Sequence, residues 1–151
     1  MEELIKIINE IVKYGLDPTV TIENKEKDLE KFLVKLYEKY FEINYIFDET
    51  DYPDNFEFDD QAIRANIRSN FGKFGQYYCV WDNHKIKNEP DIVMGDAIDD
   101  LADIICDILE VKWRYENNSE ANAWWSFELN FYAHSQRHLI NLLSYLKNMS
   151  G

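Results

Sequence analysis

The sequence predicts an all-α fold, a single-domain antiparallel helical bundle of about five helices covering residues 1–151. Glycine and proline are scarce, with five Gly and three Pro, and apolar residues recur at helical spacing along most of the chain. A length of 151 residues fits one domain, which buries roughly two-thirds of the surface that its unfolded chain exposes. Because 46% of the residues are hydrophobic and 15% are aromatic, a core can form and disorder is not expected.

Three helices are predicted in the N-terminal half. The first starts near the N-terminus and ends at Gly15, since an Asp-Pro pair follows and breaks the helical pattern. The second is a long amphipathic helix from Lys25 to Phe47, with leucines and aromatics on one face and Lys and Glu on the other. An acidic connector, Asp48 to Asp60, leads to a third helix from Gln61 to Phe71.

The segment after the third helix is predicted to lack a sheet. Residues Gln76 to Asp82 are aromatic and β-branched, which suits a short strand, but no second convincing strand is available to pair with it. We therefore expect irregular or helical structure there. A polar loop from Asp82 to Pro90 follows.

Two more helices complete the predicted bundle. The fourth begins between Asp91 and Gly95 and ends at Tyr115. The polar residues of the segment 117–119 then supply a turn and an N-cap for the last helix, Glu120 to Lys147. Short loops with one longer middle connection favour an antiparallel arrangement.

The charge of the chain restricts its partners. Sixteen Lys and Arg against 29 Asp and Glu give a formal net charge of −13. This field repels phosphate backbones and anionic lipid surfaces, so we expect neither nucleic acid nor a membrane as a partner. A basic protein or a metal cation would instead be attracted.

The sequence also predicts a cytoplasmic protein with reduced thiols. The N-terminus starts acidic and lacks the basic and apolar regions of a signal peptide, and no window approaches the roughly twenty apolar residues of a spanning helix. Cys79 and Cys106 lie in apolar surroundings without CxxC spacing, so we expect buried thiols and no disulfide.

Six carboxylates fall within an arc of roughly 100° on the fourth helix, opposite the isoleucines and leucine that would face the core. This candidate acidic face consists of Asp96, Asp99, Asp100, Asp103, Asp107 and Glu110. Like charges one turn apart repel by a few tenths of a kcal/mol per pair, so such a face usually has a compensating cation or partner. Three interpretations stay open: a solvated or salt-bridged face, with Arg114 pairing Glu110, a protein-docking face, or a metal site.

The last helix carries a candidate metal-binding pair. His134 and His138 lie one turn apart on one side, and Glu128 and Ser135 project near the middle of its apolar arc. Aspartates from the fourth helix could complete a coordination shell, which gives the candidate ligand set Asp99, Asp103, His134, His138 and Glu128. No HExxH or repeated ExxH element accompanies them, so ordinary hydrogen bonds from Asp103 or Asp107 to the histidines are the simpler interpretation.

Three stretches of the C-terminal half carry a resemblance to a known family. They are the NFGxxGxY turn at Asn70 to Tyr77, the DDLADI segment at Asp99 to Ile104, and the helix with the two histidines. Over residues 70–147 the chain resembles the domain of unknown function 5063, a family of uncharacterised bacterial proteins mainly from Bacteroidetes. It departs from the family pattern at Ser135 and Asp107. The resemblance implies an intracellular, all-α bacterial protein and supplies no activity.

The leading functional hypothesis is a non-enzymatic acidic protein-binding module of the immunity or antitoxin type, which neutralises a basic toxin and needs no cofactor. Its basis is the size, the charge, the aromatic content and the lack of recognisable catalytic motifs. A metal-dependent helical-bundle hydrolase that uses the Asp/His set with a divalent metal is one alternative. A structural oligomer is the other, and the sequence leaves the oligomeric state open.

Overall fold

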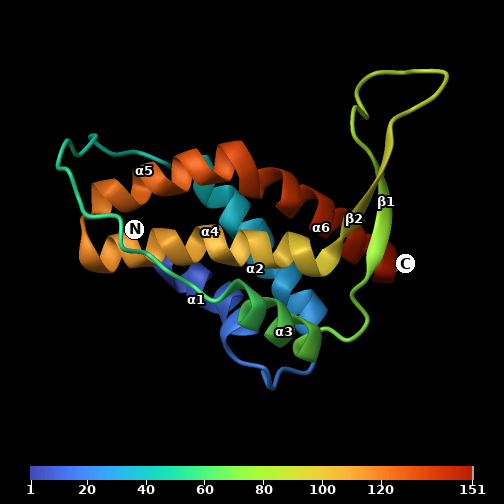
Figure 1. The fold of residues 1–151 in the computed structure, drawn as a ribbon, viewed down its shortest axis with the longest axis horizontal. Helices are drawn as coiled ribbons and strands as arrows, with labels where there is room; N and C mark the ends of the chain where they lie inside the picture. Colours follow the sequence, from blue (N-terminus) through green and yellow to red (C-terminus); the bar gives the residue numbers. More distant parts are fainter. Residues whose placement is uncertain (151) are drawn as a thin grey trace.

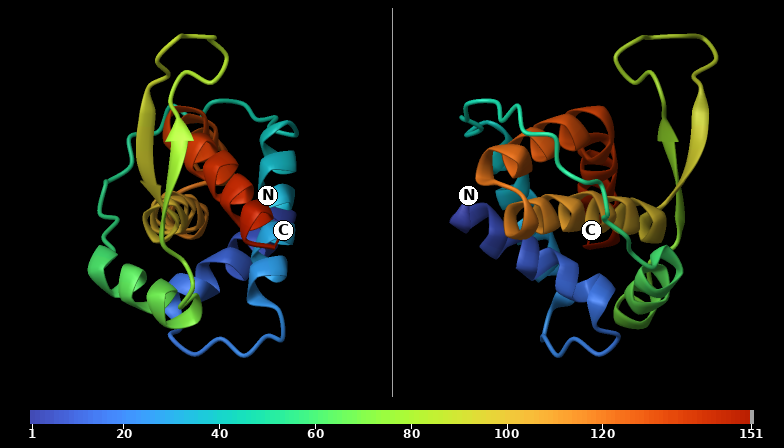
Figure 2. Two further views of the ribbon diagram at one scale, coloured as in Figure 1. Left: turned by 90° about the vertical axis from the view of Figure 1, so that its right-hand side faces the viewer. Right: turned by 60° about the vertical axis from the view of Figure 1, so that its left-hand side comes forward.

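Helix α4 (Ala97–Asn117) is the central element of the fold, and four other helices pack around it: α1, α3, α5 and α6. The computed structural model describes residues 1–150. The helices around α4 and α2 have these bounds: α1 Glu2–Leu16, α2 Lys25–Tyr40, α3 Asp60–Asn70, α5 Glu120–Asn130 and α6 Gln136–Ser150. Figure 1 shows α4 lying across the middle of the molecule, and the left view of Figure 2 looks along its axis with α1, α3 and α6 around it. The helical architecture predicted from periodicity is present.

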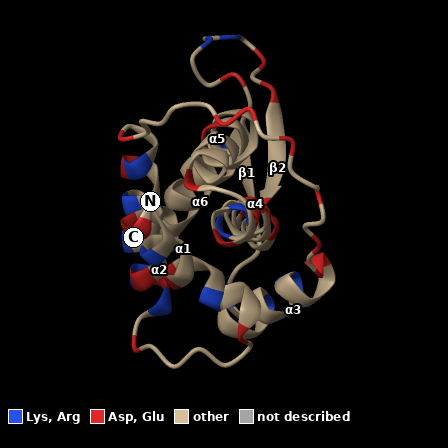
Figure 3. Cartoon of the chain, turned by 90° about the vertical axis from the view of Figure 1, so that its left-hand side faces the viewer, with Lys and Arg blue, Asp and Glu red and all other residues tan. Residues whose placement is uncertain are grey.

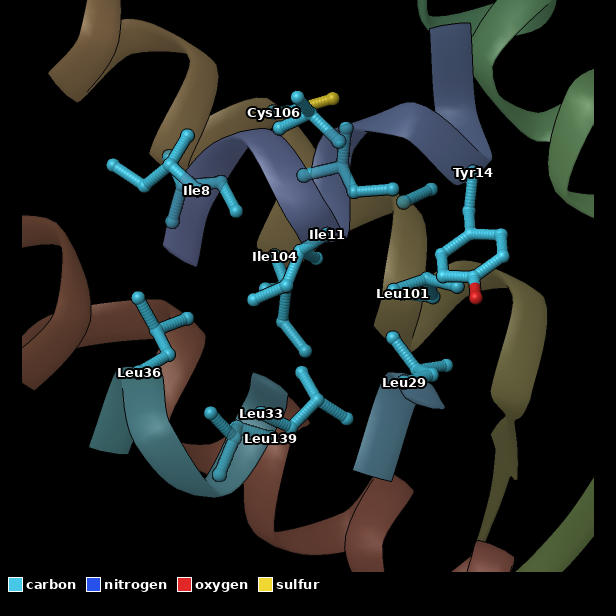
Figure 4. Close-up of a cluster of buried hydrophobic side chains, with 14 of the residues drawn as sticks. Ile8, Ile11, Tyr14, Leu29, Leu33, Leu36, Leu101, Ile104, Cys106 and Leu139 are labelled. Atoms are coloured by element: carbon cyan, nitrogen blue, oxygen red, sulfur yellow. The ribbon is translucent and has the colours of Figure 1, made fainter. Parts of the chain in front are cut away.

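The core forms where the apolar faces of α1, α2, α4 and α6 meet. The isoleucines and leucine predicted to face the core from α4 are all buried: Ile98, Leu101, Ile104, Ile105 and Ile108. They pack with aliphatic residues of α1 and α2, such as Ile11 and Leu33, and with Leu139 of α6 (Figure 4). Burying each such side chain contributes about 1.5–3 kcal/mol, so this packing fixes which side of α4 faces inward.

Helix α2 is shorter than predicted. It ends at Tyr40, with Phe41 as its C-cap, whereas periodicity extended it to Phe47. Beyond Tyr40 the apolar side chains no longer lie on one covered face, since Phe41 is 75% and Ile46 is 90% exposed while Ile43 and Tyr45 pack against the core. Helices of this length depend on packing an apolar face, so the helix stops where that packing stops. The acidic connector therefore begins earlier, and the name is used below for residues 41–59.

The prediction that residues 76–82 lack a strand partner is wrong. Strand β1 (Gln76–Val80) pairs antiparallel with β2 (Ile92–Asp96), with Tyr77 opposite Gly95, so the fold is mostly but not strictly α-helical. The predicted fourth helix, which begins between Asp91 and Gly95, includes residues that form β2 in the structure. Asp96 caps α4 by accepting from the backbone N–H of Ile98, which places the apolar run 92–94 outside the helix.

The last predicted helix is divided by a π-helical turn. A five-residue turn, η1 (Phe131–Ser135), joins α5 to α6, and the N–H of Gln136 donates to the carbonyl of Phe131. A π turn inserts one residue into the helical register, so side chains on its two sides are rotated relative to a continuous α-helix. Since His134 and Ser135 belong to η1, this shift decides where both side chains point.

Two further predictions concern membrane-spanning helices and the two cysteines. Within residues 1–150, none of the helices has both the length and the apolar composition needed to cross a bilayer. Cys106 is buried and Cys79 is half-buried, and both are free thiols, so the predicted burial is complete for Cys106 and partial for Cys79.

Candidate functional site

The acidic face of α4 points at α3, the hairpin and η1–α6, where its carboxylates bind partners within the molecule. At the N-terminal end, Asp96 caps the helix. One turn later, Arg64 of α3 donates to Asp99 through Nη1 and to Asp103 Oδ1 through Nη2, the latter at 3.2 Å. The sequence predicts a compensating cation or partner for the acidic face, and Arg64 is such a cation.

Arg64 was missed in the sequence, although its position gave a signal. It lies four residues after Asp60, and its Nε donates to that carboxylate at 2.8 Å. Three carboxylates raise the pKa of Arg64, with the hydrogen bond to Asp60 as the largest cause. By binding Asp103 Oδ1, the guanidinium leaves Oδ2 of the same carboxylate to face the histidines.

Asp100 is the most deeply buried carboxylate of the face, only 4% exposed. It accepts from the Tyr77 hydroxyl of β1 and lies 2.8 Å from Nδ1 of His138 on α6. The hydrogen bond with Asp100 raises the pKa of His138, although desolvation opposes it. Burial and Asp100 together raise the pKa of Tyr77, so its hydroxyl remains a donor. Asp100 thus joins α4, the hairpin and α6.

Asp107 holds the two polar side chains of the π turn. Its Oδ2 accepts from Ser135 Oγ at 2.5 Å and lies 2.8 Å from Nδ1 of His134. Ser135 is fully buried and His134 is half-exposed. The predicted hydrogen bond between the pair Asp107 and His134 is therefore present, and Ser135 has a role that the sequence did not assign to it.

The two imidazoles and one carboxylate converge between α4 and η1–α6. Ligand atoms of Asp103, His134 and His138 all lie within 4.8 Å of one another, and Nε2 of His138 is 3.5 Å from Asp103 Oδ2. The two rings meet edge to face with centroids 4.7 Å apart. Burial raises the pKa of Asp103, while His138 and Arg64 oppose the shift. We name these three residues the Asp/His centre.

Two of the five candidate metal ligands lie outside the Asp/His centre. Asp99 is exposed and pairs with Arg64. Glu128, expected amid the apolar arc of the last helix, is exposed on α5 and accepts from the Tyr45 hydroxyl of the acidic connector at 2.6 Å. Helical spacing alone placed Glu128 wrongly, because an arc drawn on a helix does not say which part of it other elements cover.

The C-terminal end of the face forms a separate polar cluster. Glu110 accepts from Arg114 at 2.7 Å, which is the predicted intrahelical ion pair, and from Asn130 of α5 at 3.2 Å. These contacts tie α4 to α5. Glu110 therefore belongs to the packing of these helices and not to the Asp/His centre.

The Asp/His centre has the donor set of a borderline metal site. Each imidazole holds a carboxylate at Nδ1, which fixes the ring and leaves Nε2 as the free coordinating nitrogen. Histidines that bind metals almost always make such a bond through their second nitrogen. Two ligands of one tetrahedral zinc ion are about 3.3 Å apart, so the ligand atoms of the Asp/His centre, within 4.8 Å of one another, would have to approach each other to share an ion.

The comparisons with known proteins give no relative: no family model matches the chain, and neither does any curated protein sequence or solved structure. The resemblance to the domain of unknown function 5063 therefore stays a prediction.

Proposed function

We propose that this protein binds one divalent transition-metal ion of the zinc class at the Asp/His centre. One observation carries the proposal: the Nδ1 atoms of His134 and His138 each face their own carboxylate, while ligand atoms of both histidines and Asp103 lie within 4.8 Å of one another. Imidazole with carboxylate is a borderline donor set that suits zinc and its first-row neighbours better than magnesium or calcium.

The ion would link the central helix to the π turn and to α6. A three-ligand site leaves a coordination position for water, which zinc activates by lowering its pKa. Hydrolysis would also need a general base beside that water. Since Glu128 hydrogen-bonds to Tyr45 and Asp99 pairs with Arg64, the contacts favour metal binding over a hydrolase that uses these two residues.

Metal binding is tested on the full chain after chelator treatment and dialysis. Calorimetric titration with zinc should give one equivalent bound, and cobalt should give the absorption bands of a low-coordinate site. At 100 times Kd an ion that binds only the folded state adds about 2.7 kcal/mol, so the melting temperature should rise by roughly 5–11 °C.

The variants His134→Gln, His138→Gln and Asp103→Asn should each lose this thermal shift. His84→Gln is the matched control, because His84 is exposed in the hairpin loop, outside the Asp/His centre. The proposal is wrong if the wild type binds less than about a tenth of an equivalent without a melting shift, or if the three variants bind zinc as the wild type does.

We further propose that the chain binds a basic protein, in keeping with an immunity or antitoxin role. The acidic connector supports this second function, because it contains seven acidic residues and no Lys or Arg. Figure 3 shows red bands without blue along this segment as it leads into α3. The carboxylates of the α4 face already have partners within the molecule, so the acidic connector is the better surface for a partner.

A zero-length carbodiimide cross-linker, which joins carboxylates to lysines, tests protein binding. Cross-linking in a cell extract followed by mass spectrometry should recover a basic protein linked to Glu49, Asp51, Glu57 or Asp59. Links spread evenly over acidic residues of the whole surface, or none at all, would contradict the second function.

A further inference from the structure

An apolar groove lies where the acidic connector meets α1, α3 and α4. Its volume is about 360 Å³. Its lining comes from all four segments: Leu16 of α1, residues 56–59 of the acidic connector, Ile63 of α3 and Leu109 of α4. The residues of the Asp/His centre do not line the groove.

Among the apolar residues that line the groove, Phe56 is packed against α4, whereas Phe58 and Leu16 remain accessible to solvent. Phe56 is held by Trp113 of α4, with ring centroids 5.9 Å apart, and Phe58 packs on Phe56 at 5.4 Å. Phe58 is nevertheless 46% exposed and Leu16 is 56% exposed. An apolar side chain placed between these two would remove surface of both from water, which is the usual source of affinity in such pockets.

The polar rim of the groove is acidic and lacks a cation. No Lys or Arg is among the lining residues, and in the described part of the chain none lies within 4.0 Å of the Glu57 or Asp59 carboxylates. Asp54, another carboxylate of the acidic connector, does pair with a cation, Arg114. Asp59 also caps α3 by accepting from the N–H of Ala62 at 3.0 Å, so its position is fixed.

We propose that this groove binds a basic segment of a partner polypeptide, with one apolar side chain between Leu16 and Phe58 and flanking lysines or arginines at Glu57 and Asp59. The inference rests on the second function proposed above and gives its location and chemistry. Charge complementarity selects the occupant: a second copy of this chain would bring another net charge of −13, whereas a basic segment supplies the cations that the rim lacks.

Fluorescence anisotropy with the full chain and labelled synthetic peptides tests the inference. The probe is a short lysine-rich peptide with one central leucine. Two matched peptides accompany it: one with serine in place of leucine, and one with glutamates in place of lysines. The probe should bind more tightly than the serine peptide, bind more weakly at high salt, and the glutamate peptide should not bind.

Two double variants separate the apolar and the charged contributions. Leu16→Ser with Phe58→Ser should weaken probe binding by about tenfold, while Ile86→Ser, at the fully exposed tip of the hairpin, should not. Glu57→Gln with Asp59→Asn should weaken binding similarly, and Asn preserves the helix cap. Its control is Glu23→Gln with Glu89→Gln, which changes the net charge equally on exposed residues outside the groove and outside the acidic connector.

The outcomes distinguish this inference from the function on which it rests. If no lysine-rich peptide binds the wild type, the second function fails together with the groove. If the probe binds but both groove variants bind it as well as their controls do, the second function survives and the groove is not its site. Loss of binding in the charged double variant, with an unchanged melting temperature, supports the groove without relying on the apolar variant.

Discussion

Asp100 shows how single residues set up the Asp/His centre. A buried carboxylate is costly unless it is hydrogen-bonded, and Asp100 has two partners from different elements, Tyr77 and His138. Tyr77 reaches it by lying across Gly95 of the neighbouring strand, where any side chain would block the ring. Asp103, by contrast, has its second oxygen directed at the histidines, which suits a ligand.

Replacing Gly95 by alanine should destabilise the fold and displace Tyr77. A methyl group at this position would lie within 2.7 Å of three atoms of the Tyr77 side chain, and overpacking of this kind costs about 1–3 kcal/mol. Chemical denaturation measures the loss. Gly72→Ala is the control, because its methyl group would meet nothing within 4 Å. Equal stability of the two variants would mean that the ring moves freely.

Cys106 should resist alkylation in the native protein. Burial, aided by Asp60 and other nearby carboxylates, raises the pKa of its thiol to about 12, so the reactive thiolate is scarce at neutral pH. Mass spectrometry after brief iodoacetamide treatment should show Cys106 unmodified in the folded chain and modified in urea. Rapid native modification would indicate that α3 and α4 separate readily.

At the scale of elements, the acidic connector shows how a segment without regular structure is held in place. Asp48 accepts from Ser119, the N-cap residue of α5, at 2.5 Å, and from Tyr52 at 2.7 Å. Tyr45 donates to Glu128, and burial with that carboxylate raises the pKa of Tyr45 to about 12. These bonds fix the path of the acidic connector and thereby the wall of the groove.

The Asp48 anchor should make the stability depend on pH in acid. Hydrogen bonds from Ser119, Thr50 and Tyr52 lower the pKa of Asp48 below its ordinary 3.8. A lowered carboxyl pKa contributes stability that is complete above the unfolded value and is lost as the pH falls through the folded value. Asp48→Asn should therefore melt below the wild type at neutral pH, and the difference should shrink once the pH drops below 3.8.

The control for this effect is Asp51→Asn, which removes a charge from the same connector without changing the Ser119 contact. Melting curves of the three proteins across the acid range provide the measurement. If the difference between Asp48→Asn and the wild type is unchanged well below pH 3.8, the anchor does not depend on the ionised carboxylate.

At the scale of the whole molecule, the net charge of −13 opposes folding through repulsion among the carboxylates. Sodium chloride should therefore raise the melting temperature of the metal-free protein, because the Debye length falls from about 10 Å at 0.1 M to about 3 Å at 1 M. Thermal melts across this range, in the presence of chelator, provide the measurement. A falling melting temperature would instead show that ion pairs such as those of Arg64 outweigh the repulsion.

How much of the fold could be predicted differs between its parts. The apolar side of α4 followed from periodicity, since five aliphatic residues on one arc of a helix are all buried only when that arc faces the core. The hairpin did not, because pairing β1 with β2 depends on contacts between residues far apart in the chain. The end of α2 could not be predicted either, since the helix ends where its apolar face no longer packs against other elements, and their position is not a local property of the sequence.

The residue types of the candidate site could be predicted from the sequence, whereas their pairing depends on the tertiary structure. Spacing placed His134 and His138 on one side of a helix and six carboxylates along another, and these statements depend only on local geometry. Spacing could not select Asp103 over Asp99, because that choice depends on which of the two carboxylates His138 of α6 approaches, and Arg64 pairs with both. The predicted position of Glu128 was wrong because spacing does not show which part of α5 other elements cover, and Glu128 is exposed.

The sequence by itself determined that this chain is mostly helical and strongly acidic, and that His134, His138 and the aspartates of α4 lie at helical intervals. These properties follow from composition and from the period of the helical backbone. Both are independent of which residues are distant neighbours in the fold. Only the tertiary structure decided that the acidic face of α4 points inward at Arg64, Tyr77 and two histidines, leaving the acidic connector to present carboxylates to solvent. Orientation between helices depends on packing across the core, and no local pattern contains that information.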